Sequence, residues 1–303
     1  MARRYRRKKK VPILYVVIAA LLAAAVYFGS LWLAPKENTQ TPAPENAEEL
    51  VVHYIDVGQG DAISLEVPDG NNMLIDAGPG SAEDELVAYL DGIGVTEIDY
   101  FVLTHPDEDH IGGADLIFAE YTISTVILPD CKKDTKAYEN MINGIENEDG
   151  CERLEPVMGQ TFSMGQGAVI TVLGPISDRY EDTNDYSVVL RLDYYETSFL
   201  FTGDAEKTSE MEMIERWTDG ELDCDVLKVG HHGSRTSTNL AFLKLVTPEL
   251  AVISCGEDNK YGHPHGEAIQ RLNDENIPIY RTDLLGSIVV TSDGKSATCL
   301  SNE

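Results

Sequence analysis

The sequence predicts an α/β domain in which two β-sheets lie face to face and helices cover their outer sides. Short apolar runs of strand length occur in both halves of residues 50–303, and stretches with helical spacing separate them. Several of these runs end in a turn that carries His or Asp, which is how sites at strand ends are commonly built. The region has about 250 residues, enough for one large domain with a sizeable core.

In the first half, an apolar run and a Gly-rich turn predict the first strand, and two more short runs flank a Pro-Asp-Gly-Asn turn. Ser81 to Asp84 has capping-box spacing and predicts the start of a helix that reaches about Leu90. The expected elements are strands at 51–57, 62–67, 73–76, 98–103 and 125–128, and helices at 81–90, 111–119 and 134–147.

In the second half, two strand-like runs around Tyr195-Glu196 predict a hairpin. Residues 205–217 alternate acidic and apolar residues at helical spacing, and strands and helices then alternate along the chain. The expected strands are 168–173, 187–194, 197–202, 224–229, 250–255, 278–281, 287–291 and 297–300, and the expected helices are 205–217, 238–246 and 266–276.

The N-terminus predicts a membrane anchor. Residues 1–10 carry seven Lys or Arg, and residues 11–33 carry no charge, a length that spans a bilayer. The basic tail (1–10) predicts a cytoplasmic N-terminus, so the domain at 50–303 is expected outside the cell on a single-pass signal anchor (11–33). A cleavable signal peptide is the alternative, but its apolar region is usually only about 7–15 residues. Residues 34–49 predict a disordered linker.

The charge restricts the partners. The chain has 23 basic and 52 acidic residues, and without the seven basic residues of the tail 16 remain, a net charge of −36. Such a surface repels nucleic acid and anionic lipid unless a metal ion or a local basic patch intervenes.

Six of the seven histidines lie in three short clusters, and these predict a metal site. The first cluster, residues 104–110, reads THPDEDH and follows an apolar run directly. Asp204, the pair His231-His232 and the pair His263-His265 each follow another strand-like run. Imidazole and carboxylate groups that converge on one point are typical ligands of Zn²⁺, Mn²⁺ or Fe, and they are unusual as packing residues of a core.

These motifs resemble the metallo-β-lactamase superfamily, and within it the soluble hydrolase domain of ComEC-type competence proteins. The resemblance covers about residues 51–301 and implies a four-layer αββα sandwich. The motifs that carry it are DVGQGD (56–61), LIDAG (74–78), THPDEDHIGG (104–113), the segment 184–190, FTGD (201–204), LKVGHHGS (227–234) and YGHP (261–264).

The resemblance implies one or two divalent ions, Zn or Mn, and no organic cofactor. It implies that His105 and Asp107 hold one ion, that Asp109 and His110 face the other, and that Asp204 bridges them. His231 completes this ligand set, while His232 is its hydrogen-bonding neighbour. Asp109, His232 and His263 are the expected catalytic residues. Asp107 stands where the superfamily usually has His, and a harder carboxylate shifts preference toward Mn²⁺.

Other positions are expected around the ions. Asn184 and Ser187 stand where the superfamily has its middle histidine, which leaves one ion position weaker. Lys228 and Arg235 flank the histidine pair and are the best local basic pair for a phosphate. Ser234 is expected to bind a non-bridging oxygen. The residues expected to brace the loops and ligands are Asp56, Gln59, Asp61 and Asp76.

The function that follows is a metal-dependent phosphodiesterase outside the cell membrane, with nuclease-like activity on DNA. Two cations close together acidify a shared water and polarise a phosphoryl oxygen. One alternative is the hydrolysis of a small or cell-wall-linked phosphodiester such as choline phosphate, which accommodates the negative charge better. A second alternative is a non-catalytic tethered binding module with a degenerate metal site.

Overall fold

The computed structural model describes residues 43–44, 47–68, 71–217 and 220–300. The basic tail, the signal anchor and most of the linker predicted above lie outside the described residues. None of the helices in the described part of the chain has the length and apolar character that a membrane-spanning helix needs.

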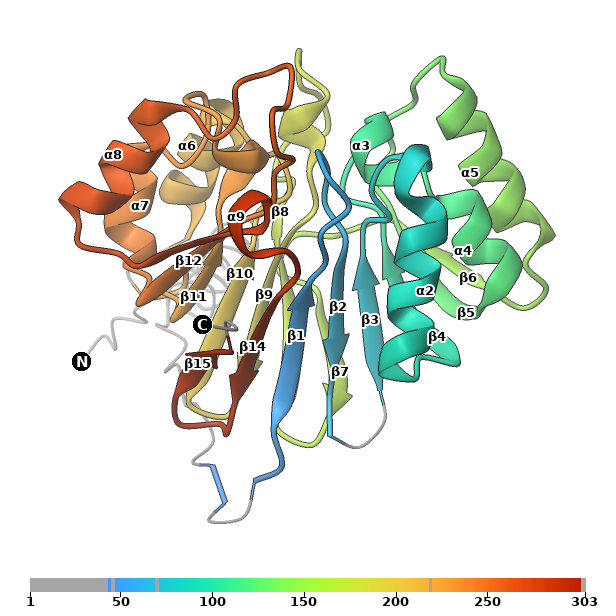
Figure 1. Cartoon of the computed structure of the whole chain (residues 1–303), viewed down its shortest axis with the longest axis horizontal. Helices are drawn as coiled ribbons and strands as arrows, with labels where there is room; N and C mark the ends of the chain where they lie inside the picture. Colours follow the sequence, from blue (N-terminus) through green and yellow to red (C-terminus); the bar gives the residue numbers. More distant parts are fainter. Residues whose placement is uncertain (1–42, 45–46, 69–70, 218–219, 301–303) are drawn as a thin grey trace, which may run out of the picture. The chain divides into compact units, whose positions relative to one another are not determined.

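Two β-sheets form the centre of the domain (Figure 1). The first sheet has eight strands in the order β15-β14-β1-β2-β3-β4-β5-β6. Its strands are β1 (Leu50–Tyr54), β2 (Ile63–Glu66), β3 (Asn72–Ile75), β4 (Glu97–Val102), β5 (Thr122–Ile127), β6 (Glu152–Leu154), β14 (Ile288–Ser292) and β15 (Ala297–Cys299).

The second sheet has seven strands in the order β13-β12-β11-β10-β9-β8-β7. Its strands are β7 (Thr161–Gly165), β8 (Ala168–Gly174), β9 (Val189–Tyr194), β10 (Thr197–Phe201), β11 (Val226–Lys228), β12 (Leu250–Ile253) and β13 (Ile279–Arg281). The predicted hairpin is confirmed, since β9 pairs antiparallel with β10.

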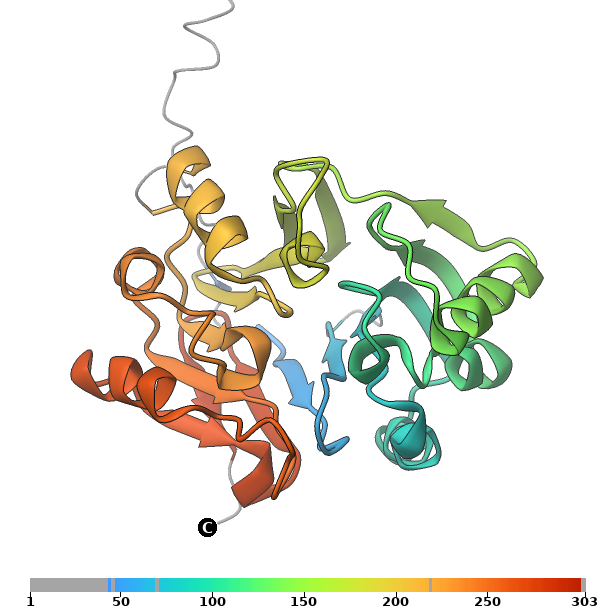
Figure 2. The same ribbon diagram turned by 90° about the horizontal axis from the view of Figure 1, so that it is seen from above.

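Helices flank the two sheets on their outer sides, as the view from above shows (Figure 2). Helices α2, α4 and α5 share a buried core cluster with the first sheet, and α6, α7 and α8 share one with the second. The helices are η1 (Gly80–Ala82), α2 (Glu83–Ile93), α3 (Glu108–Ile111), α4 (Ala114–Glu120), α5 (Lys136–Asn147), η2 (Asn184–Tyr186), α6 (Lys207–Arg216), η3 (Gly230–Gly233), α7 (Leu240–Val246), α8 (Gly266–Asp274) and α9 (Thr282–Leu285).

A third core cluster lies between the sheets and confirms the predicted four layers. Tyr54 from the first sheet and Phe201 from the second have their ring centroids 6.3 Å apart. All five residues of β10 are buried, since one face meets the other sheet and the opposite face meets helices. A strand that is buried on both faces has a nearly continuous apolar sequence, and this pattern predicted β10.

Each sheet contains a set of adjacent parallel strands, its parallel block, and the His and Asp motifs follow the carboxyl ends of several of these strands. Strands β3 to β6 are parallel in the first sheet, and β10 to β13 are parallel in the second. The loops that leave β4, β5, β10, β11 and β12 therefore gather at one edge of the sandwich, which is where ligands bind in open α/β sheets.

Some predicted boundaries are wrong. Strands β6 and β7 were not expected, because β6 has only three residues, two of them exposed, and β7 has five residues of which one is buried. The helix expected at 111–119 is two short helices, α3 and α4, which Gly112 and Gly113 separate. The capping box at Ser81 is wrong, since neither η1 nor α2 has a side-chain cap. Thr135 and Asn239 do cap α5 and α7 through their side chains.

The end of the predicted linker contacts the domain. The Ala43 amide donates to Glu196 Oε1 at 3.2 Å, and Tyr194 Oη donates to the Glu48 carbonyl at 2.7 Å. Ala43 and Ala47 also lie against the core between the sheets. These contacts place residues 43 and 47–48 on the domain, where we expected a disordered chain.

Candidate active site

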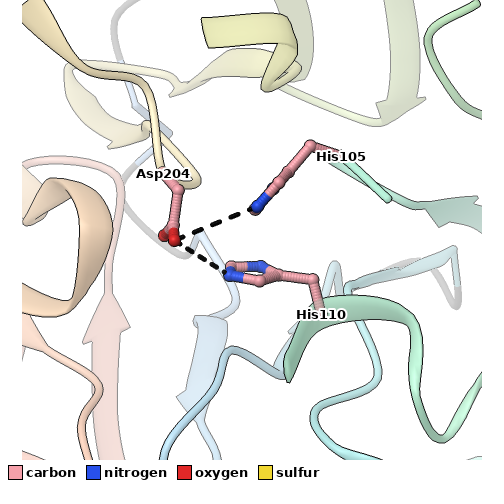
Figure 3. Close-up of side chains that lie close together, drawn as sticks. All are labelled: His105, His110 and Asp204. Carbon is pink, nitrogen blue, oxygen red and sulfur yellow. Dashed lines mark ion pairs between the residues drawn. The ribbon is translucent and has the colours of Figure 1, made fainter. Parts of the chain in front are cut away.

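Two segments of the chain bring two histidines and an aspartate together (Figure 3). His105 follows β4, His110 lies in α3, and Asp204 follows β10. Asp204 Oδ2 lies 3.3 Å from His110 Nε2 and 4.0 Å from His105 Nε2. All three side chains are buried. Residues about a hundred positions apart in the sequence therefore share one point.

Two further residues face the same point. His232 Nε2 lies 3.4 Å from Asp109 Oδ2 and 3.5 Å from Asp204 Oδ2. Among the described residues, four groups could hold a metal ion: His105, His110 and Asp204; Asp109, His110 and His232; Asp61, Asp204 and His232; and Asp61, Asp76 and His110.

The donor atoms at this point lack other partners. His105 Nε2, His110 Nε2, His232 Nε2 and Asp204 Oδ1 are buried and make no hydrogen bond to the described residues. Buried polar atoms are nearly always paired, so a set of unpaired ones that converge needs an explanation. Neutral imidazole and carboxylate are ordinary ligands of divalent ions, and the residues fit such an ion well.

The opposite ring nitrogens are held by the protein. His110 Nδ1 lies 2.7 Å from Asp76 Oδ2, and His232 Nδ1 lies 3.0 Å from the Ser254 carbonyl. Asp76 also accepts from the Thr104 amide and hydroxyl, at 2.7 and 2.6 Å. A partner that accepts a proton from Nδ1 leaves the Nε2 lone pair free to bind a metal. Asp76 thus lies where we expected a bracing residue.

Electrostatics at this point favour bound positive charge. Burial disfavours the charged form of His232, but Asp204 and Asp61 outweigh burial and raise its pKa to about 10. Burial likewise opposes a charged His110, whose pKa Asp204 and Asp76 nevertheless raise. Burial opposes a charged Asp204, and the neighbouring histidines lower its pKa. Protons occupy these ring nitrogens when no ion is bound, so an ion must displace them.

A left-handed turn aims the histidine pair. His231 and His232 have φ values of 46° and 51°, a region that residues other than Gly enter rarely. Gly233 follows with φ of 77°, and a Cβ there would lie 2.6 Å from the Pro264 side chain. The turn sends the two imidazoles in different directions, with their rings 74° apart. Backbone strain of this kind clusters at functional sites.

The placement favours His232 over His231 as a ligand, the reverse of our expectation. His231 Nδ1 lies 2.9 Å from Glu206 Oε1, and its Nε2 lies 3.6 Å from Asp204 Oδ2. His231 belongs to none of the possible ligand groups among the described residues, whereas His232 belongs to two. Sequence spacing did not separate the two histidines, since only the turn decides which ring points inward.

Asp107 lies at the rim. Its Oδ1 accepts from Lys133 Nζ at 2.6 Å and from Thr183 Oγ1 at 3.0 Å, and it lies 3.9 Å from His105 Nε2. Asp107 is in no possible ligand group of the described residues, although we expected it to hold an ion. Lys133 was missed because it lies far from the motifs in sequence, in the loop between β5 and α5.

Lys228, one member of the predicted basic pair, is not available to a phosphate. Lys228 is fully buried, and its Nζ donates to Asp61 Oδ2 at 2.7 Å and to the Val229 carbonyl at 3.1 Å. Arg235 is exposed and lies 4.0 Å from Glu267. Lys228 ends a strand that is buried on both faces, so its side chain has no path to solvent.

A cavity of about 100 Å³ opens onto the cluster. It is lined by Gln59, Asp107, Asp109, Asn184, Asp204, His231, His232, Tyr261 and His263. Burial, then the charges of His231 and His232, lowers the pKa of His263 to about 4, so this ring is neutral at pH 7. A neutral ring suits ion binding or hydrogen bonding better than the role of a protonated acid.

The remaining predicted residues make hydrogen bonds within the protein. Asn184 Nδ2 lies 3.4 Å from His231 Nδ1, and the Ser187 hydroxyl accepts from the Asp204 amide at 3.0 Å. Gln59 Oε1 accepts from the Gly256 amide. Ser234 is buried and bonds Thr236. Asp56 is exposed, accepts from the Gly58 amide within its own turn, and belongs to none of the possible ligand groups among the described residues.

Comparison with known proteins agrees with this geometry. A family model described as the metallo-beta-lactamase superfamily matches residues 55–257. ComE operon protein 3 of Bacillus subtilis is 32% identical over 259 residues, which are 80% of this chain and 33% of the relative. Recombination protein 2 of Haemophilus influenzae is 34% identical over 244 residues, 79% of this chain and 28% of that protein. The chain therefore spans about a third of the length of these relatives.

The fold likeness extends to solved structures. The metallo-beta-lactamase fold protein YhfI from Bacillus subtilis superposes with a TM-score of 0.50 at 13% identity, over 77% of this chain and 96% of YhfI. At that identity the likeness shows the fold alone.

Proposed function

Since this chain belongs to the metallo-beta-lactamase superfamily, we propose that it is a metal-dependent phosphodiesterase with nuclease-like activity. The observation that carries the proposal is the convergence of His110, His232 and Asp204, whose buried Nε2 and Oδ1 atoms lack hydrogen-bond partners in the described part of the chain. Asp109 Oδ2 adds a carboxylate 3.4 Å from His232 Nε2. A divalent ion held there would polarise a phosphoryl oxygen and acidify a water.

The protein's own groups prepare this site for hydrolysis. Asp76 and the Ser254 carbonyl fix the rings of His110 and His232, so little reorganisation is needed when a ligand arrives. Asp109 lines the cavity, within reach of a water beside the substrate. Neutral His263 has a buried Nδ1 without a partner in the described part of the chain, and this atom is suited to hydrogen-bond the leaving group.

The proposal of a nucleic-acid substrate comes from the relatives, two of which are named as competence and recombination proteins. The net charge of −36 beyond residue 10, from 16 basic and 52 acidic residues, opposes tight binding along a DNA chain. We therefore expect contact with only a few phosphates next to the metal site. The apolar segment at 11–33 favours a membrane anchor, which would place the domain outside the cell.

A second candidate is a small or cell-wall-linked phosphodiester with a cationic group, such as choline phosphate attached to a cell-wall polymer. A cavity of about 490 Å³ lies beside Tyr186, which follows Asn184 in η2. Asp130, Glu155 and Asp178 line this cavity, and three carboxylates there disfavour a second phosphate. A cationic group would be favoured in the same position.

The experiment uses the full-length protein, stripped of metal and supplied with Mn²⁺ or Zn²⁺. We expect cleavage of both bis(p-nitrophenyl) phosphate and linear DNA. Asp109→Ala should lower the rate at least about a hundredfold, since it removes a residue that faces the ion. Asp56→Ala is the matched control, because Asp56 is exposed and braces its own turn.

The outcomes separate the candidates. Cleavage of the small ester without DNA would support the small phosphodiester. The absence of turnover with either metal would overturn the phosphodiesterase proposal and leave a non-catalytic binding module.

A further inference from the structure

Lys133 holds Asp107 at the rim of the metal cluster. Lys133 Nζ lies 2.6 Å from Asp107 Oδ1, and the same oxygen accepts from Thr183 Oγ1 at 3.0 Å. The side chains of Lys133 and Asp107 are 32% and 27% exposed, and Asp107 lines the cavity while Lys133 reaches it from the solvent side. This carboxylate already has a cation and a hydroxyl as partners.

The possible ligands do not divide evenly between two ions. His110 has only Nε2 available, because its Nδ1 is bonded to Asp76. One imidazole nitrogen binds one ion, so an ion held by Asp109, His110 and His232 leaves His105 without His110. His105 Nε2 is then left with Asp107 at 3.9 Å and Asp204 at 4.0 Å as possible co-ligands, and the oxygens of both already have other partners.

Two other features weaken a second ion next to His105. Asn184, in η2, lines the cavity with Asp107, and its Nδ2, which is a hydrogen-bond donor, lies 3.4 Å from His231 Nδ1. The ammonium of Lys133 repels a divalent cation close to Asp107, and it competes for the same oxygen.

We propose that the site binds one divalent ion tightly, at Asp109, His110, Asp204 and His232, and that the Lys133 ammonium takes the place of a second ion beside Asp107. This inference deepens the proposed function and rests on it for the role of the ion in phosphodiester hydrolysis. The ammonium supplies a fixed positive charge to an anionic oxygen of the substrate, as a second ion would. Lysine does so as a compact point charge.

Metal stoichiometry tests the inference without any need for turnover. The full-length protein is dialysed against buffered Mn²⁺ or Zn²⁺, and bound metal is measured by mass spectrometry and by calorimetric titration. We expect one tight equivalent in the native protein. Lys133→Met frees Asp107 and removes the repulsion, so a second equivalent should bind at least about tenfold more tightly than in the native protein.

Two further variants serve as controls. Lys136→Met removes a cation from the same segment, but Lys136 is 73% exposed and pairs with Glu139, so the stoichiometry should stay at one. Lys133→Arg keeps the charge and should also stay at one. Circular dichroism checks that each variant is folded.

Two results would overturn the inference: two equally tight ions in the native protein, or no gain of metal in folded Lys133→Met. Neither result depends on cleavage of a phosphodiester. If cleavage fails while the stoichiometry follows this pattern, the proposed function is wrong and the metal assignment stands.

Discussion

Two lysines near the metal cluster make ion pairs of the same length in opposite surroundings. Lys228 Nζ lies 2.7 Å from Asp61 and is wholly buried, whereas Lys133 Nζ lies 2.6 Å from Asp107 and is 32% exposed. The buried pair joins a turn of the first sheet to β11 of the second, so its role is to hold the two sheets together. The rim pair can open toward a ligand. Equal distances therefore do not imply equal roles, because solvent decides whether a charge is available.

The largest expected effect comes from breaking the buried pair. Lys228→Met leaves the Asp61 carboxylate buried without its cation, which should lower the free energy of unfolding by about 3–5 kcal/mol. Denaturant titration measures this loss. Lys133→Met should cost less than about 1 kcal/mol in the same assay, since exposed pairs contribute little. If Lys228→Met and Lys133→Met lowered the free energy of unfolding by similar amounts, the distinction between a buried structural pair and an exposed rim pair would be wrong. Lys228→Met combined with Asp61→Asn should recover part of the stability.

Glu210 is a buried carboxylate that has no lysine partner, and its effect on stability should therefore depend on pH in the opposite way to that of Asp61. Burial raises the pKa of Glu210 to about 7, although the backbone amides of Asn239 and Thr238 bond it. Burial also opposes the charge of Asp61, but there Lys228 and His232 lower the pKa. Between pH 4.5 and 7, Glu210 is therefore protonated in the folded protein and ionised in the unfolded chain.

It follows that the contribution of Glu210 to stability is full below pH 4.5 and is lost as the pH rises through 7. The loss should be about 3 kcal/mol. Unfolding titrations at pH 4.5, 6 and 8 measure it as the difference between the native protein and Glu210→Gln. An identical pH profile in both proteins would show that folding leaves the pKa of Glu210 unshifted.

Metal binding should release protons. The raised pKa values of His110 and His232 mean that an ion displaces protons at pH 7, so calorimetry in buffers of different ionisation enthalpy should detect release of one or more protons. Affinity should fall as the pH is lowered. A heat independent of the buffer would contradict protonated rings in the metal-free site.

The smallest expected effect concerns the rim pair in catalysis. If Lys133 contacts the substrate, Lys133→Met should raise KM for bis(p-nitrophenyl) phosphate about tenfold, or about 1.4 kcal/mol. Steady-state kinetics with Lys136→Met as the control measures this change. A KM equal to that of the native protein would show that Lys133 does not contact the substrate and affects only metal binding.

Much of the site could be predicted because its residues follow strand-like runs in short motifs. His105, His110 and Asp204 belong to such motifs, and the sheets bring them together. Lys133 could not be predicted, since no motif marks it and only the parallel block places its loop beside Asp107. Lys228 was misjudged because proximity in sequence to the histidines says nothing about burial.

The parallel blocks of the two sheets each supply part of the metal cluster. His105, Asp109 and His110 come from the first sheet, and Asp204 and His232 come from the second. Neither sheet alone offers the complete set, so high-affinity metal uptake reports that both have folded and met. A bound ion would thus report the assembly of the two sheets, and a chain cut between β6 and β7 should lose its metal affinity until the two pieces associate again.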